Sequence, residues 1–176
     1  MSKTRRIAMD GVLAAVYFAL SALTFTVGSL QIRFTALALI VAALLFTTLD
    51  ACAVALVGEL LYQIILFGLT ATTPVWLAPP LLHGLLLGLS AGLIRKKLPE
   101  NRQIPAFFAA CIVCGLLNAC FNTAALYVDA HVYHYYHPET FFVQALVRLG
   151  VSVLTAVVTA AAGLPLARLL RPAVNQ

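Results

Sequence analysis

Charge is scarce in this chain of 176 residues. Charged residues make up 10% of it, with 6 acidic side chains against 11 lysines and arginines, whereas hydrophobic residues make up 62%. The mean hydropathy is +1.00. Soluble domains average about 25% charged and roughly 45–50% apolar residues. This composition excludes a soluble fold and predicts an all-α integral membrane protein.

Motifs of catalysis and redox chemistry are also missing. The sequence has no HExxH, P-loop or GxSxG motif, and no second CxxC accompanies C111-I-V-C114. The four cysteines all lie in apolar runs, where neither a disulfide scaffold nor a reactive thiolate is favoured. We therefore expect no enzyme activity, no metal and no cofactor. Without an ATP site, active transport would need an ion gradient or partner subunits.

What the chain does have is a series of long apolar runs separated by short polar breaks. They predict six helices at about 8–30, 34–49, 51–68, 75–94, 104–128 and 141–170. The second and third are short enough to be tilted or partly re-entrant. No polar linker interrupts the chain, so residues 1–176 are expected to form one domain. No cleavable signal peptide is recognisable at the start.

The positions of the cations predict the orientation in a lipid bilayer. Nine of the 11 lysines and arginines precede the first helix, follow the fourth or end the sixth. With six spans these three regions share one side, which the positive-inside rule assigns to the cytoplasm, together with both termini. Cations gathered at the ends of apolar runs do not form a nucleic-acid-binding face.

Polar side chains within the predicted helices converge at one depth. Glu59 and Gln63 lie one turn apart on the third helix, roughly 13 and 8 Å below its outer end at ~1.5 Å per residue. The other three long helices place polar groups in the same layer: His83, Asn118, Asn122 and Arg148. The predicted outer loops and helix ends add further candidates for binding: Arg33, Thr72, Thr73 and Trp76.

Two interpretations of this polar layer stay open. An ionised side chain near the middle of a bilayer costs about 2.5–3.5 kcal/mol, so Glu59 and Arg148 need compensation. They could pair with each other, bridged by the amides. Alternatively, the layer lines an outward-facing pocket for a polar ligand. Arg33 is either an anion contact at the rim of that pocket or a surface arginine, and Trp76 either stacks on a ligand or belongs to an interfacial aromatic belt.

Small residues repeat along the first helix at steps of three and four. The stripe comprises Ala8, Gly11, Ala15, Ala19 and Ala22. Such stripes allow close approach of another helix. The partner could be a neighbouring helix of the same bundle or a separate membrane protein docking on Gly11, Ala15 and Ala19.

Together these features resemble the substrate-binding S components of energy-coupling factor (ECF) transporters, the bacterial vitamin importers. The resemblance rests on six spans with both termini inside and on the AxxxA motif formed by Ala15 and Ala19. It also includes the run I32-R-F-T-A-L-A-L-I-V-A-A-L-L-F46 followed by G58-E-L-L-Y-Q63.

This resemblance implies a high-affinity subunit of the bacterial plasma membrane that captures its substrate from outside. It would dock through the alanines of its first helix on an ECF coupling subunit driven by two ATP-binding-cassette ATPases. The family is thought to topple in the bilayer to release its ligand inside. From the residues themselves, a flat heterocycle such as a folate-like pterin or a queuosine-type base suits the layer, with pantothenate and cobalamin open. The alternative function is a stand-alone secondary transporter with Glu59 and His83 as a proton relay.

Overall fold

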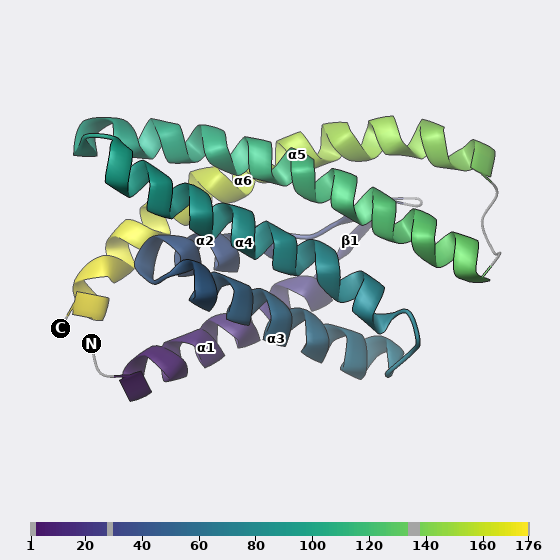
Figure 1. Cartoon of the computed structure of the whole chain (residues 1–176), viewed down its shortest axis with the longest axis horizontal. Helices are drawn as coiled ribbons and strands as arrows, with labels where there is room; N and C mark the ends of the chain where they lie inside the picture. The colour runs from purple at the N-terminus through teal and green to yellow at the C-terminus, as the bar shows by residue number, and fades with distance from the viewer. Residues whose placement is uncertain (1–2, 28–29, 134–137, 176) are drawn as a thin grey trace.

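The computed structural model describes residues 3–27, 30–133 and 138–175. The elements in these residues follow the order α1 (Lys3–Ala22), β1 (Phe25–Val27), β2 (Leu30–Ile32), α2 (Ala36–Leu45), α3 (Thr48–Phe67), α4 (Thr73–Lys97), α5 (Glu100–Tyr133) and α6 (Pro138–Asn175). The helices form one bundle, and both termini lie at the same end of it (Figure 1). The predicted series of six helices is confirmed in this part of the chain.

The short helix α2 lies at the centre of the bundle. Its residues 38–43 are at most 1% exposed, as expected for a helix that is apolar on every side. It packs against α1, α3, α4 and α6. Arg95 of α4 holds its C-terminal end, because Nη2 donates a hydrogen bond to the carbonyl oxygen of Ala43 at 3.0 Å. At ~1.5 Å per residue, these 10 residues are too short to cross a bilayer core of about 30 Å.

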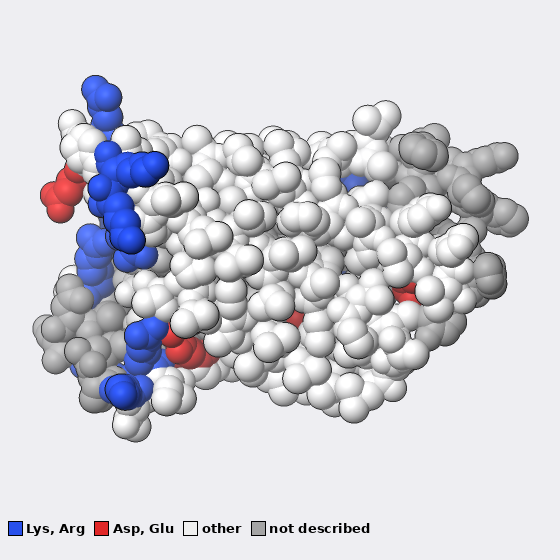
Figure 2. All heavy atoms as spheres, in the orientation of Figure 1, with Lys and Arg blue, Asp and Glu red and all other residues white. Residues whose placement is uncertain are grey.

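The outer surface is that of a membrane protein. Within the described residues, α3, α4, α5 and α6 each contain a segment long and apolar enough to cross a membrane. Large apolar side chains such as Leu93, Val113 and Leu154 are more than half exposed on these helices. Lysines and arginines gather at the end that holds the termini, while the long face in Figure 2 is almost free of charge. A multi-pass membrane protein has this distribution.

The predicted first helix, 8–30, is wrong at its C-terminal end. α1 stops at Ala22, and β1 then pairs antiparallel with β2, with Phe25 opposite Ile32. Among the described residues, the fold is therefore helical apart from this two-stranded hairpin. The sequence holds a signal for this change, since T24-F-T-V27 favours extended backbone over helix and Gly28-Ser29 separates it from the second strand. Hydropathy alone does not distinguish these states.

The break predicted between the helices at 104–128 and 141–170 is also wrong in most of its length. α5 continues to Tyr133, and α6 already begins at Pro138. Residues 134–137, which include His134 and His137, lie outside the described residues. The polar side chains Asp129 and His131 are consequently on a helix, where their direction is set by helical periodicity.

α1 is tied to the start of α3 by a polar cluster near the termini. Arg6 Nε donates to Asp50 Oδ1 at 2.8 Å, and its Nη2 donates to Thr47 Oγ1 at 2.7 Å. Asp50 also accepts a hydrogen bond from the backbone N–H of Thr47 at 2.7 Å, which completes a capping box at the N-terminus of α3. A single arginine thus joins α1 to a helix cap.

Replacing Arg6 by alanine should destabilise the bundle by about 1–2 kcal/mol, a value between those of exposed and buried charge-assisted bonds. Asp50 is largely buried and would lose its cationic partner. The measurement is the thermal unfolding midpoint in detergent micelles. Lys3→Ala removes an exposed cation from the same turn and should leave the midpoint unchanged. A midpoint equally unaffected by Arg6→Ala would show that the cluster contributes no stability.

Candidate functional site

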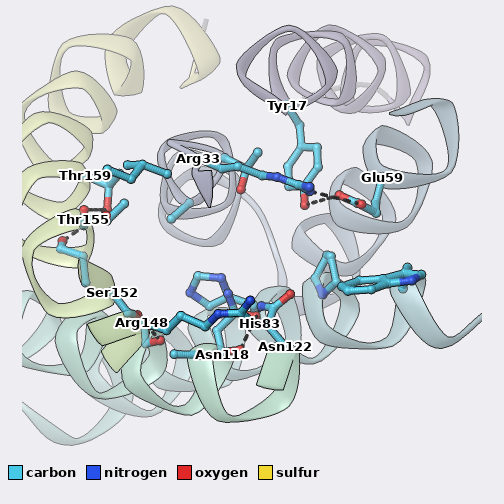
Figure 3. A pocket seen from close by; sticks show the side chains of 18 of the residues that line it. Tyr17, Arg33, Glu59, His83, Asn118, Asn122, Arg148, Ser152, Thr155 and Thr159 are labelled. Carbon is cyan, nitrogen blue, oxygen red and sulfur yellow. Dashed lines mark hydrogen bonds and ion pairs between the residues drawn. The ribbon is translucent and has the colours of Figure 1, made fainter. Parts of the chain in front are cut away.

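A cavity of about 670 Å³ lies between the helices. All six helices contribute to its wall, and it extends to Thr70 and Thr72 in the α3–α4 connection, at the end of the bundle opposite the termini (Figure 1). Figure 3 shows polar side chains pointing into it from several sides. Nine of the ten residues predicted for substrate binding line this cavity: Arg33, Glu59, Gln63, Thr72, Trp76, His83, Asn118, Asn122 and Arg148.

Glu59 of α3 is the centre of one wall. Its side chain is buried, with the residue 2% exposed. Tyr17 donates its hydroxyl proton to Oε2 at 3.1 Å, and Gln63 Nε2 donates to Oε1 at 3.0 Å. Arg33 Nη1 lies 3.6 Å from Oε1. The carboxylate therefore faces one cation and two neutral donors that come from three separate segments of the chain.

Tyr17 reaches Glu59 because α1 and α3 are in close contact at Gly58. A Cβ atom on Gly58 would lie only 2.5 Å from Tyr17 Cδ1, so no other residue at this position leaves room for the ring. Sequence reasoning missed Tyr17 as a site residue. The signal is present, since at 100° per residue Tyr17 is about 200° from Ala15 and hence opposite the small-residue stripe of α1.

Arg33 follows the hairpin directly and turns into the cavity. Its guanidinium carbon lies 4.6 Å from the ring centroid of Tyr62, within the range of a cation–π contact. Together with its ion pair to Glu59, this contact excludes the interpretation of Arg33 as a surface arginine. Of the two interpretations left open for Glu59, pairing with Arg148 is not what the described residues show, since the cation beside Glu59 is Arg33.

Arg148 of α6 lies on the other side of the cavity, near Asn118 and Asn122 of α5 (Figure 3). Asn122 Nδ2 donates to the backbone oxygen of Asn118 at 2.9 Å. Ser152 Oγ donates to the carbonyl oxygen of Gly115 at 2.8 Å, which links α6 to α5. This second wall has one cation, two amides and a stripe of hydroxyl groups.

Trp76 and Asp129 connect α4 to α5 in the cavity wall. The indole Nε1 donates to Asp129 Oδ2 at 3.0 Å, and Asp129 is 5% exposed. The indole is thereby fixed by a partner inside the protein, which separates it from an aromatic belt in contact with lipid headgroups. Sequence reasoning placed Asp129 in a loop. The spacing from Asn118 through Asn122 to Asp129 continues one helical stripe and could have identified it.

Two further predicted residues differ in their positions. Thr73 is buried but does not line the cavity, because its hydroxyl accepts the backbone N–H of Thr70 at 3.0 Å and turns into the connection. His83 of α4 does line the cavity and is buried. The hydrogen bonds of Glu59 go to Tyr17 and Gln63, and none joins it to His83 among the described residues.

The small-residue stripe of α1 is directed away from this site. Ala8, Gly11, Ala15, Ala19 and Ala22 are all exposed, and a Cβ atom on Gly11 would meet no atom within 4 Å. The buried face of the helix consists instead of Leu13, Ala14, Tyr17 and Ser21. The stripe is therefore not an internal contact of this bundle.

Comparisons with known proteins agree on one family. The family model described as "ECF transporter, substrate-specific component" matches residues 5–172. The fold is similar to a solved S component of a bacterial ECF transporter, with a TM-score of 0.71 and 20% identity over 99% of this chain and 100% of that one. It is also similar to ThiT from Listeria monocytogenes, with a TM-score of 0.69 and 19% identity over 98% of this chain and 97% of that one. None of the curated proteins matches the sequence.

Proposed function

The chain belongs to the family of ECF transporter substrate-specific components, and from this premise we propose that it is the subunit that captures a vitamin-like heterocycle for uptake. It would bind the substrate outside the cell with high affinity and act without enzymatic chemistry of its own. The observation that carries this proposal is the cavity of about 670 Å³, whose polar lining is placed inside an otherwise apolar bundle. Buried polar groups are costly unless they are paired or meet a ligand.

The cavity has the form of a ligand site. Its volume lies within the roughly 300–1,000 Å³ of sites for small molecules. Glu59 and Arg148 are each on a different wall, so the two charged groups do not neutralise each other across a closed interface (Figure 3). Glu59 has its ion pair with Arg33 on its own wall, and Arg148 faces it from the other wall. A solute between the walls meets both.

The partners we propose are an ECF transmembrane coupling subunit and two ATP-binding-cassette ATPases. The exposed face of α1 supports this, because alanines and a glycine allow a partner helix to approach closely. The basic end of the bundle supports a cytoplasmic location of both termini (Figure 2). We infer six membrane-inserted helices, with α1 and the short α2 included, in the plasma membrane of a bacterium.

For the substrate, a folate-like pterin or a queuosine-type base has the best support. Both are flat, and the cavity offers the aromatic ring of Trp76 together with amide and charged groups at its edges. The alternative, a secondary transporter with a proton relay from Glu59 to His83, has less support, since the hydrogen bonds of Glu59 lead toward α1 and along α3 instead.

The test is affinity purification of the chain after co-expression with the coupling subunit and ATPases of its source genome. We expect all three proteins to be retained. Denaturing the complex should release a heterocyclic small molecule, which mass spectrometry identifies. A chain that purifies alone under conditions that preserve other S-component complexes would contradict the proposal, as would a retained metal ion or lipid in place of a heterocycle.

Leucine in place of Ala15 should reduce retention of the coupling subunit by about five- to one-hundredfold. The larger side chain would keep α1 apart from the helix of the coupling subunit, whose backbone has to approach closely. Overpacking a helix interface in this way costs about 1–3 kcal/mol. Melting of the isolated chain should not change, because Ala15 is exposed. Ala109→Leu, at an exposed position of α5, is the matched control. Equal retention of the coupling subunit by both variants would place the docking surface elsewhere.

A further inference from the structure

The hydroxyl groups in the cavity wall of α6 present hydrogen-bond acceptors, and not donors, to a ligand in the cavity. Ser152, Thr155 and Thr159 follow one another at steps of three and four and point to the same side (Figure 3). Each hydroxyl has one proton, and each donates it to a backbone carbonyl at 2.8 Å: to Gly115, Val151 and Thr155 in turn. What remains at each oxygen for a ligand is a lone pair.

Several neutral donors of the facing wall are engaged in the same way, although the amide of Gln63 keeps a second N–H for a ligand. Tyr17 and Gln63 donate to the carboxylate of Glu59, and Trp76 donates its single N–H to Asp129. A further acceptor lies on α5, where the buried Oδ1 of Asn118 receives no hydrogen bond from any residue that the structure describes. A buried amide oxygen without a donor is costly, and a ligand donor would satisfy it.

The formal charges of the cavity lining balance within the described residues. Arg33 and Arg148 contribute two positive charges, and Glu59 and Asp129 contribute two negative charges. No large excess of one sign is available to stabilise a polyanion or a polycation. The guanidinium groups nevertheless offer local donors for a carbonyl or a single acidic group.

We propose that the ligand is an amino-substituted nitrogen heterocycle of low net charge, whose N–H donors face the hydroxyl oxygens of α6 and the amide oxygen of Asn118. This inference rests on the proposed function and narrows its substrate class. An exocyclic amino group supplies two donors in the plane of a flat ring. A ligand with a carbonyl at the same edge would place acceptor against acceptor and leave both without a proton.

The proposal can be tested with matched pairs of probes in which an exocyclic amino group is exchanged for a carbonyl and the neighbouring ring nitrogen gains a proton. In pterin and lumazine, guanine and xanthine, cytosine and uracil, and adenine and hypoxanthine, an amino group is replaced by a carbonyl. We expect at least one amino probe to raise the melting temperature of the full-length chain in detergent. It should bind about tenfold or more tightly than its carbonyl partner, because an unsatisfied buried acceptor costs about that factor.

Three results would overturn the proposal. They are tighter binding of a carbonyl probe than of its amino partner, equal binding within every pair, and no binding of any amino probe. A failure of this kind differs from a failure of the proposed function, which is measured by retention of the coupling subunit and needs no ligand. Folic acid, which carries two carboxylates beside its amino-substituted ring, serves as a charge probe and should bind less tightly than pterin.

A pair of threonine variants locates the acceptors. Thr155→Val removes the hydroxyl oxygen from the cavity with little change of shape and should weaken binding of the best amino probe about three- to tenfold. Thr123→Val is the matched control, since Thr123 Oγ1 donates to the carbonyl oxygen of Ala119 at 2.8 Å in the same manner but lies outside the cavity. Equal effects of the two variants on binding would contradict the role assigned to the α6 hydroxyls.

Discussion

Glutamine in place of Glu59 is expected to weaken binding of the co-purified small molecule by a factor of ten to about one hundred. The two side chains have the same shape, so the packing of α1 on α3 is preserved. Glutamine removes the negative charge that faces Arg33 and turns one acceptor into a donor beside Gln63 Nε2. The loss of a charge-assisted hydrogen bond between the Glu59 carboxylate and the bound molecule costs about 1.5–3 kcal/mol. Isothermal titration of the purified chain measures the effect.

The chain offers a matched control for this variant. Glu100 is an exposed acidic residue in the first turn of α5, and Glu100→Gln should leave both binding and the yield of folded protein unchanged. Should Glu59→Gln lower the yield of folded protein as much as it lowers binding, Glu59 would be a structural residue of the α1–α3 contact. Normal affinity in a well-folded Glu59→Gln protein would remove Glu59 from the ligand site.

Alanine in place of Gly88 is expected to lower the free energy of unfolding more than Arg6→Ala does. The Cβ of an alanine at this position would lie 2.6 Å from Thr48 Cα and 2.9 Å from Thr48 Cγ2. A backbone atom at the start of α3 cannot rotate away, so α3 and α4 must separate. Overpacking of this kind costs about 1–3 kcal/mol. The thermal unfolding midpoint of Gly88→Ala in detergent micelles should fall accordingly.

Gly92, one turn later on α4, is the matched position. A Cβ atom there would meet nothing within 4 Å, and alanine is favoured over glycine in a helix interior by up to about 1 kcal/mol. Gly92→Ala should therefore leave the midpoint unchanged or raise it, so that the two variants differ in sign. A similar shift of the midpoint in both would mean that helix propensity, and not the approach of α3 to α4, determines the effect.

The polar residues of the cavity could be predicted because they interrupt long apolar segments. Glu59, His83, Asn118 and Arg148 are conspicuous against helices otherwise made of Leu, Ala and Val. Counting residues from the predicted helix ends gave them a common depth, and depth along a straight helix needs no tertiary information. The structure brings all four to one cavity. Their roles in binding remain the proposal tested above.

Partners within the cavity could not be predicted in the same way. By depth, the sequence offered Arg148 to Glu59 and placed Arg33 in an outer loop, and only the path of the hairpin brings Arg33 beside Glu59. Tyr17 was missed because a tyrosine in an apolar helix does not contrast with its neighbours. Its role depends on Gly58, which is 41 positions away in the chain and allows the ring to pass.

The sequence alone determined that this chain inserts into a membrane, how many helices it forms and which end carries the cations. These properties depend on the free energy of transferring each residue from water to lipid. That free energy can be summed over one local segment of the chain at a time. The tertiary structure decided where α1 ends, which cation faces Glu59, and that the small-residue stripe is directed outward. Those properties depend on contacts between segments far apart in the chain, which no local pattern of residues specifies.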